Sequence, residues 1–247
     1  MENDPSTLAT LQAHTHHFTY AENLGQPDCL VPCLKFDWQP TRPPVVLDFW
    51  TPQAPGPGQA ECFTTVATWK NLGKDLRVGG GTYRWSKDEN FLRVIDLPHR
   101  ASQPIELALE NIDAATSDRL RAKGWRITDA FSKSRDTEAY RDHIHASRGE
   151  FTVSKDLVVR TRTGWFSDRS VCYLAAGKPV VTQETGFSKS LPTGLGLYAF
   201  RTLEDIPPAI EAINSDYQKH SQSAKEIAAE YFNAAKVLRQ VMLEAGV

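Results

Sequence analysis

The stretch that decides the fold is residues 150–186, EFTVSKDLVVRTRTGWFSDRSVCYLAAGKPVVTQETG. It predicts a polar loop at 163–166, a turn at 167–170, a short helix at 171–176 ended by Gly177, and a buried strand at 178–183. Ser167 or Asp168 is a suitable N-cap, and the first helical turn then has free backbone N–H groups. With the helix dipole and Arg169 beside it, that helix end suits a phosphate or diphosphate.

The order of these features resembles the donor-binding segment of glycosyltransferases of the GT-B fold. The resemblance rests on a polar loop with serine, a helix ending in LAAGKPVV, a strand, and a loop with glycine. The blocks SRGEFTVSKD and GWFSDRS are similar to a bacterial subgroup described only as glycosyltransferases. The resemblance extends from about residue 61 to the C-terminus and implies a Rossmann-like donor domain.

In that family the helix N-terminus and the loop before it hold the diphosphate of a nucleotide-sugar. The residues that the resemblance places there are Thr163, Gly164, Ser167, Asp168, Arg169 and Ser170. Arg169 is interpreted as a guanidinium clamp, so Arg169→Ala should weaken nucleotide binding by about 1.5–3 kcal/mol and leave the fold intact. The alternative is an ordinary capped helix, because serine and aspartate are common at N-caps.

One position departs from the family pattern. The glutamate that commonly grips the ribose would fall at Cys172, and a thiol cannot accept two hydroxyl hydrogen bonds. Ribose binding would then fall to Glu184 or Asp168.

Further donor-site candidates lie in three places. They are Lys87, then Arg148, Glu150 and Lys155, and then Gln183, Glu184, Thr185 and Gly186. A lysine can neutralise a leaving diphosphate in place of a metal ion, and ligands lie beyond the carboxyl ends of parallel strands. The alternatives are the second position of a capping box for Lys87, a solvated charge run around 148–156, and a turn at 183–186.

Composition narrows the class of protein. The chain has 247 residues, 40% of them hydrophobic and 23% charged, and a net charge of −2, which gives no footprint for nucleic acid or anionic membrane. It has no apolar run near ~20 residues and no secretory signal, so we expect a cytoplasmic protein. The spacing of Cys29 and Cys33 and the histidines at 14–17 and 143–145 do not favour a metal site, so cysteines and histidines are expected to be ordinary packing or solvated groups.

Two regions differ in organisation. Residues 1–60 are rich in proline and should be irregular, with one strand at 44–50 and a linker at 51–59; we interpret them as the remnant of an acceptor domain. From residue 61 to 247, strands at 63–69, 104–109, 125–127 and 151–153 alternate with helices at 86–95, 113–123, 137–146, 207–214 and 217–244. That alternation predicts an α/β, Rossmann-like parallel sheet flanked by helices.

These observations favour a metal-independent glycosyltransferase without a cofactor. It would move a sugar from a nucleotide donor, for which we favour UDP, to an unknown acceptor. The catalytic base of such enzymes usually comes from the acceptor domain, so none is assigned, and the isolated chain should transfer little or no sugar. An acceptor domain would be missing or supplied by a partner, and the C-terminal helix should expose the apolar patch that it covers. The alternative is a non-catalytic nucleotide-binding module or a truncated enzyme fragment.

Overall fold

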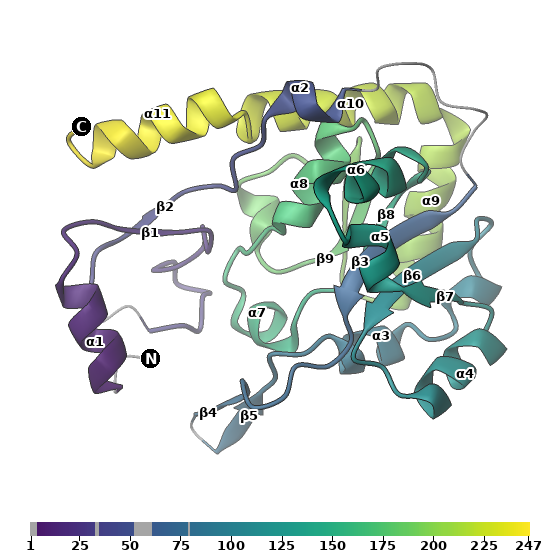
Figure 1. Ribbon diagram of the computed structural model, residues 1–247, viewed down its shortest axis with the longest axis horizontal. Helices are drawn as coiled ribbons and strands as arrows, with labels where there is room; N and C mark the ends of the chain where they lie inside the picture. The colour runs from purple at the N-terminus through teal and green to yellow at the C-terminus, as the bar shows by residue number, and fades with distance from the viewer. Residues whose placement is uncertain (1–3, 33–34, 52–60, 79) are drawn as a thin grey trace.

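The structure is a computed structural model, and it describes residues 4–32, 35–51, 61–78 and 80–247 (Figure 1). The expectations for Cys33 and for most of the linker at 51–59 lie outside the described residues.

A six-stranded sheet with all strands parallel forms the centre of the molecule (Figure 1). Its order is β10-β9-β8-β3-β6-β7. The bounds are β3 (Phe63–Thr68), β6 (Ile105–Glu110), β7 (Arg126–Asp129), β8 (Gly149–Thr152), β9 (Val180–Gln183) and β10 (Leu197–Phe200). The chain runs outward from β3 through β6 to β7 and then returns to β8 on the other side of β3. This reversal of direction is the place where open parallel sheets bind ligands.

Helices cover both faces of the sheet, and the central strands β3, β8 and β9 bury side chains on both sides. One face packs on α3 (Asp88–Arg93), α4 (Ala114–Ala122) and α9 (Ile206–Ser215). The other packs on α6 (Thr137–His145), α8 (Asp168–Ala175) and α10 (Tyr217–Tyr231). The predicted α/β class is thus confirmed.

The strand predicted at 44–50 is wrong. Val45 forms a single parallel bridge with Asn233, and the next residues form α2 (Leu47–Trp50). The Val45 amide donates to the carbonyl of Phe232 (2.8 Å), and the Ala234 amide donates to the carbonyl of Val45 (3.0 Å). Val45 therefore pairs with a break between helices and not with a sheet edge.

That same pairing interrupts the helix predicted at 217–244. The structure has α10 and then α11 (Ala234–Glu244). Phe232 is buried between them, and the Asn233 side chain accepts a hydrogen bond from the Ala235 amide as the N-cap of α11. The expected exposed apolar patch is confirmed on α11, where Leu238, Met242 and Leu243 are about half exposed or more.

Several short elements had no sequence prediction. They are the helices α5 (Ala130–Ser134) and α7 (Asp156–Thr161), the strand β10, the hairpin of β4 (Leu76–Val78) and β5 (Gly81–Tyr83), and the 3-10 turns at Leu97–His99 and Phe187–Lys189. The helix predicted to begin at about Leu203 or Pro207 begins with a 3-10 turn at Leu203–Asp205 and continues as α9. The capping box predicted at 86–89 is absent, because the Ser86 hydroxyl bonds to the backbone of Asn71 instead.

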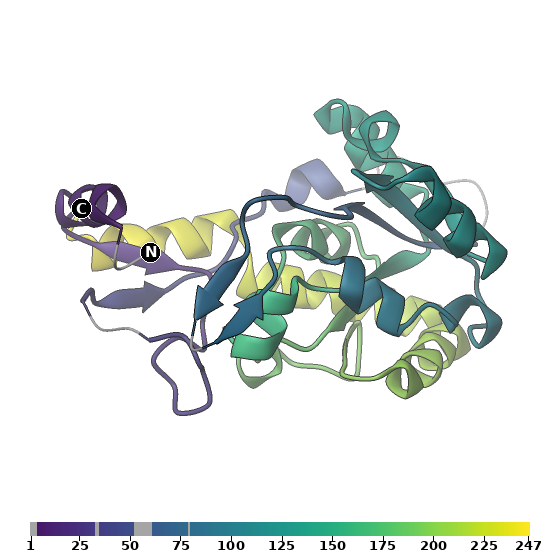
Figure 2. The same cartoon turned by 90° about the horizontal axis from the view of Figure 1, so that it is seen from below.

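Only short elements occur in the described part of residues 4–51. They are α1 (Pro5–Gln12), the parallel pair β1 (His17–Thr19) and β2 (Trp38–Pro40), and α2. The helix α1 and the strands β1 and β2 lie beyond one end of the sheet, on the side toward which α11 extends, whereas α2 packs on α8 (Figures 1 and 2). None of the described helices is both long and apolar enough to cross a membrane.

Candidate functional site

A cavity of about 480 Å³ opens where the chain reverses direction, at the carboxyl ends of β3 and β8. Its wall comes from both strand ends, from the loop before β4, from the start of α3 and from the start of α8. The cavity lining includes Asn71, Lys74, Trp85, Lys87, Lys155, Trp165, Ser167, Asp168 and Arg169. The parallel sheet thus places its cavity where this topology usually binds ligands.

Three lysines, Lys74, Lys87 and Lys155, converge on the cavity. Burial, and then the nearby Arg169, lower the pKa of Lys87 well below its ordinary value. Burial, and then Lys74, also lower the pKa of Lys155, whose Nζ lies 3.9 Å from the centre of the Trp85 ring. Neighbouring cations lower one another's pKa, and a bound anion stabilises their charged forms.

The N-terminus of α8 forms another part of the wall. The helix begins at Asp168, three residues before the predicted start, and Ser167 occupies the N-cap position without a side-chain capping bond. Asp168 Oδ1 accepts a hydrogen bond from the Arg169 amide (3.0 Å). Within the described chain, the amides of Asp168 and Ser170 have no hydrogen-bond acceptor. Asp168 lines the cavity, so its free N–H at the positive helix end suits an anion, whereas Ser170 is fully buried.

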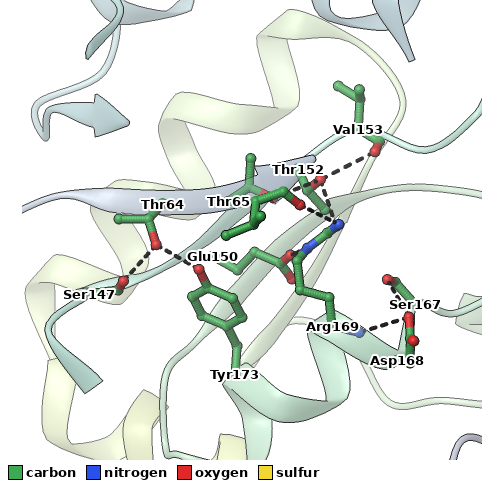
Figure 3. A network of polar contacts seen from close by, with 11 residues as sticks. Thr64, Thr65, Ser147, Glu150, Thr152, Val153, Ser167, Asp168, Arg169 and Tyr173 are labelled. Atoms are coloured by element: carbon green, nitrogen blue, oxygen red, sulfur yellow. Dashed lines mark hydrogen bonds and ion pairs between the residues drawn. The ribbon is translucent and has the colours of Figure 1, made fainter. Parts of the chain in front are cut away.

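The contacts of Arg169 differ from those predicted from the sequence. Its Nε donates to Glu150 (2.5 Å) and one terminal nitrogen donates to the Thr152 hydroxyl (2.9 Å), as Figure 3 shows. The other terminal nitrogen donates to the Val66 carbonyl (2.9 Å). Glu150 is fully buried. The guanidinium therefore neutralises a carboxylate beneath the cavity, and the sequence-based interpretation of Arg169 as a free phosphate clamp does not fit its geometry.

Glu150 belongs to a buried polar layer between the sheet and α8. In the same layer the Thr64 hydroxyl lies within hydrogen-bond distance of Ser147 (2.6 Å) and of Tyr173 (2.7 Å) (Figure 3). Glu150 therefore lies behind the cavity wall and not in it.

Arg148 lies away from the cavity, which corrects its place among the donor-site candidates. It precedes β8 and so lies at the amino end of the sheet. There its Nε donates to Asn214 (2.7 Å), and its guanidinium lies 4.5 Å from the centre of the Tyr217 ring. The strand begins at residue 149 and not at 151, so Arg148 falls at the opposite end from the ligand edge.

The remaining candidates lie behind the cavity wall. Gln183 Oε1 accepts from the Ser154 amide (3.1 Å), and the Thr185 hydroxyl donates to the Trp165 carbonyl (2.6 Å). Glu184 accepts from the Gly186 amide. Thr163 and Gly164 hold the same loop through the backbone, and Ser170 is fully buried. These residues support the loop before α8 and do not line the cavity.

The position of the ribose-binding glutamate is occupied by a neutral thiol. Burial, and then the nearby Asp168, raise the pKa of Cys172 to about 12. Asp168 lies four residues earlier, which is one helical turn, and lines the cavity. Of the two proposed substitutes, Asp168 is therefore at the cavity and Glu184 is not.

Sequence reasoning missed Lys74 and Trp165. Lys74 lies in an exposed loop that carries no motif, and only the fold of the hairpin segment brings it to Lys155. Trp165 lies in the polar loop predicted at 163–166, and a tryptophan in such a loop was the signal present in the sequence. In the structure this residue is 37% exposed.

Among the residues that the structure describes, no group of three or more histidine, cysteine, aspartate or glutamate side chains is arranged to hold a metal ion. His145 Nε2 lies 2.9 Å from the Trp50 carbonyl, and His14 Nδ1 lies 2.7 Å from the Thr10 carbonyl, so each has an ordinary backbone partner.

No protein-family model matches the chain, and no curated protein matches it. Solved structures do match. Anabaena HepE, crystallised with UDP and glucose, has a TM-score of 0.57 and 12% identity over 85% of this chain and 57% of its own. Sucrose-phosphate synthase from Thermosynechococcus elongatus has a TM-score of 0.54 and 12% identity, over 86% and 53%. S. aureus TarM, crystallised with UDP among its ligands, has 0.55 and 10%, over 90% and 44%.

The chain thus spans about half the length of these proteins. At such low identity, the match establishes the fold. The fold is that of one half of GT-B glycosyltransferases, which confirms the fold resemblance seen in the sequence.

Proposed function

We propose that this chain binds a nucleotide-sugar and takes part in transferring its sugar to an acceptor, as the donor-binding half of a GT-B glycosyltransferase. The observation that carries the proposal is the convergence of three lysines and a free helix N-terminus on one cavity, at the reversal point of a parallel sheet. Residues 61–247 would form the donor-binding unit.

In this proposal the diphosphate lies between the α8 N-terminus and the lysines. The amide of Asp168, which lines the cavity, donates to a phosphate oxygen, and Lys87 and Lys155 neutralise the charge that grows as the sugar leaves. Such cations act where other enzymes use a metal ion, so binding should not need one. Asp168, one turn before Cys172, accepts hydrogen bonds from the ribose hydroxyls.

We favour UDP as the nucleotide because HepE was crystallised with UDP-glucose and TarM with UDP. The sugar and the acceptor are left open.

Titration calorimetry with UDP, GDP and ADP tests the proposal. UDP is expected to bind, with equal affinity in EDTA, because lysines and backbone amides supply the positive charge. Uridine is the matched control: it lacks the diphosphate and should bind much more weakly. If none of the three diphosphates binds at millimolar concentration, the donor-site proposal fails.

Nucleotide binding should also take up protons. A bound diphosphate opposes the effects of burial and of Arg169, so it raises the depressed pKa of Lys87. Affinity is therefore greatest below the pKa that Lys87 has in the free protein and falls as the pH rises above it.

Calorimetry at about pH 8 detects this uptake, because phosphate groups, with a second pKa of about 6, are then ionised. The binding enthalpy should differ between two buffers of different ionisation enthalpy. Lys87→Ala should remove most of the difference. Equal enthalpies for the unchanged protein, with an affinity independent of pH, would contradict this account.

A module that holds a nucleotide without transferring sugar needs the same cavity, so affinity alone does not separate the two functions. Turnover does. Release of UDP from UDP-glucose, with and without added acceptor sugars or a candidate partner domain, identifies an enzyme; tight binding without any turnover under all these conditions identifies a binding module.

A further inference from the structure

We infer that Asn23 and Asp28, from the N-terminal segment, are positioning residues of the donor site. They hold the loop at 161–165, which enters α8 at the cavity wall. The effect on nucleotide affinity rests on the proposed function, whereas the effect on the loop itself does not.

Backbone contacts join the two segments. The Asn23 amide donates to the Thr163 carbonyl (3.0 Å), and the Leu30 amide donates to the Thr161 carbonyl (2.9 Å). Ala21 forms an antiparallel bridge with Trp165, a residue that lines the cavity. Residues 21–30 thus run alongside the loop over most of its length.

The Asn23 side chain fastens this contact. It is almost fully buried, its Nδ2 donates to the Arg162 carbonyl (2.7 Å), and its Oδ1 accepts from Lys189 Nζ (3.1 Å). Asp28 pairs with Arg162 Nε (2.9 Å) and with Lys189. One amide and one carboxylate therefore connect the loop before α8 to the turn after β9.

The loop that they hold has an unfavourable backbone conformation. Arg162 has φ of +52° and Gly164 has φ of +78°. A Cβ at Gly164 would lie 2.6 Å from the Asn23 amide nitrogen, so the two segments touch at a position where only glycine fits. Non-glycine residues persist in the left-handed region only when their surroundings determine it. Without the contacts of Asn23 and Asp28, the loop should spend time in other conformations that displace Trp165 and Ser167.

Loss of order in a binding loop lowers affinity by the fraction of time that the competent form is lost. Asn23→Ala and Asp28→Ala should therefore speed hydrogen exchange of amides in 161–168 by about tenfold in the free protein. UDP affinity should fall in proportion to the time that the loop spends outside its native conformation, and by about tenfold where that conformation is kept only a tenth of the time. The denaturant midpoint should change little, because the sheet core does not contact these side chains.

Lys189 provides a test by conservative replacement. Lys189→Arg keeps a cation near Asn23 and Asp28 and should retain the exchange protection and the affinity. Lys189→Gln loses the charge and should resemble Asp28→Ala. If Asn23 and Asp28 served only general stability, Lys189→Arg and Lys189→Gln would not differ in the hydrogen exchange of the loop alone.

Gly164→Ala and Gly194→Ala form a matched pair. Both glycines have positive φ, but a Cβ at Gly194 meets nothing within 4 Å. Both variants carry the backbone strain, and only Gly164→Ala also pushes Asn23 away. Gly164→Ala should speed loop exchange and weaken UDP binding well beyond Gly194→Ala.

Unchanged loop exchange in Asn23→Ala and Asp28→Ala would overturn the inference. So would a fall in affinity that only follows a fall in the denaturant midpoint, since that marks a structural role. If the unchanged protein fails to bind UDP, the proposed function fails, and the exchange experiment still decides whether Asn23 and Asp28 order the loop.

Discussion

Arg169→Ala is expected to lower the free energy of unfolding by about 3–5 kcal/mol, the usual cost of removing one partner from a buried ion pair. Glu150 is fully buried, and its paired oxygen lies 2.5 Å from Arg169 Nε. Removing the guanidinium leaves that carboxylate without its cation, and it also removes a donor from the Val66 carbonyl and from the Thr152 hydroxyl, which keeps only the longer contact from the Thr65 hydroxyl (3.3 Å). Chemical denaturation followed by circular dichroism measures the loss.

Arg100→Ala is the matched control, because Arg100 pairs with Glu204 at the surface, where such pairs contribute about 0–1 kcal/mol. Replacing both buried partners, as Glu150→Leu with Arg169→Met, should recover most of the loss, since no unpaired charge then remains. A destabilisation by Arg169→Ala no larger than that of Arg100→Ala would restore the interpretation of Arg169 as a ligand-binding group.

Lys87→Ala is expected to weaken binding of UDP by about 1.5–3 kcal/mol, which is more than tenfold, because it removes a charge-assisted contact to the diphosphate. Unlike Arg169→Ala, Lys87→Ala should not lower the free energy of unfolding. The depressed pKa shows that burial and the nearby Arg169 disfavour the charged lysine, so its removal should leave the free energy of unfolding unchanged or raise it slightly.

Lys70→Ala is the control for this variant. Lys70 is exposed on the same segment and does not line the cavity. Calorimetry of both variants with UDP, beside their unfolding curves, gives the comparison. Equal affinities for Lys87→Ala and Lys70→Ala would show that Lys87 does not contact the diphosphate.

Much of the fold could be read from local patterns. The β-branched and aromatic residues of 63–69 predicted β3, apolar runs next to proline predicted β6 and β9, and the segment after Ser167 predicted a helix whose first turn lines the cavity. The strand predicted at 44–50 does not form. A run of apolar residues needs a neighbouring strand to become one, and Val45 finds a gap between two helices instead.

The sequence by itself determined the α/β class, the helix end at Ser167 and Asp168, and Lys87 and Lys155 as candidate cations. These follow from the residues of single elements and from the order of elements along the chain, both of which can be read from the sequence. Only the tertiary structure decided which charges meet. Strand order put Arg148 at the far end of the sheet, side-chain direction turned Arg169 toward Glu150, and the path of residues 21–30 brought Asn23 to the loop before α8. Contacts between residues distant in sequence follow from packing, which a local pattern does not encode.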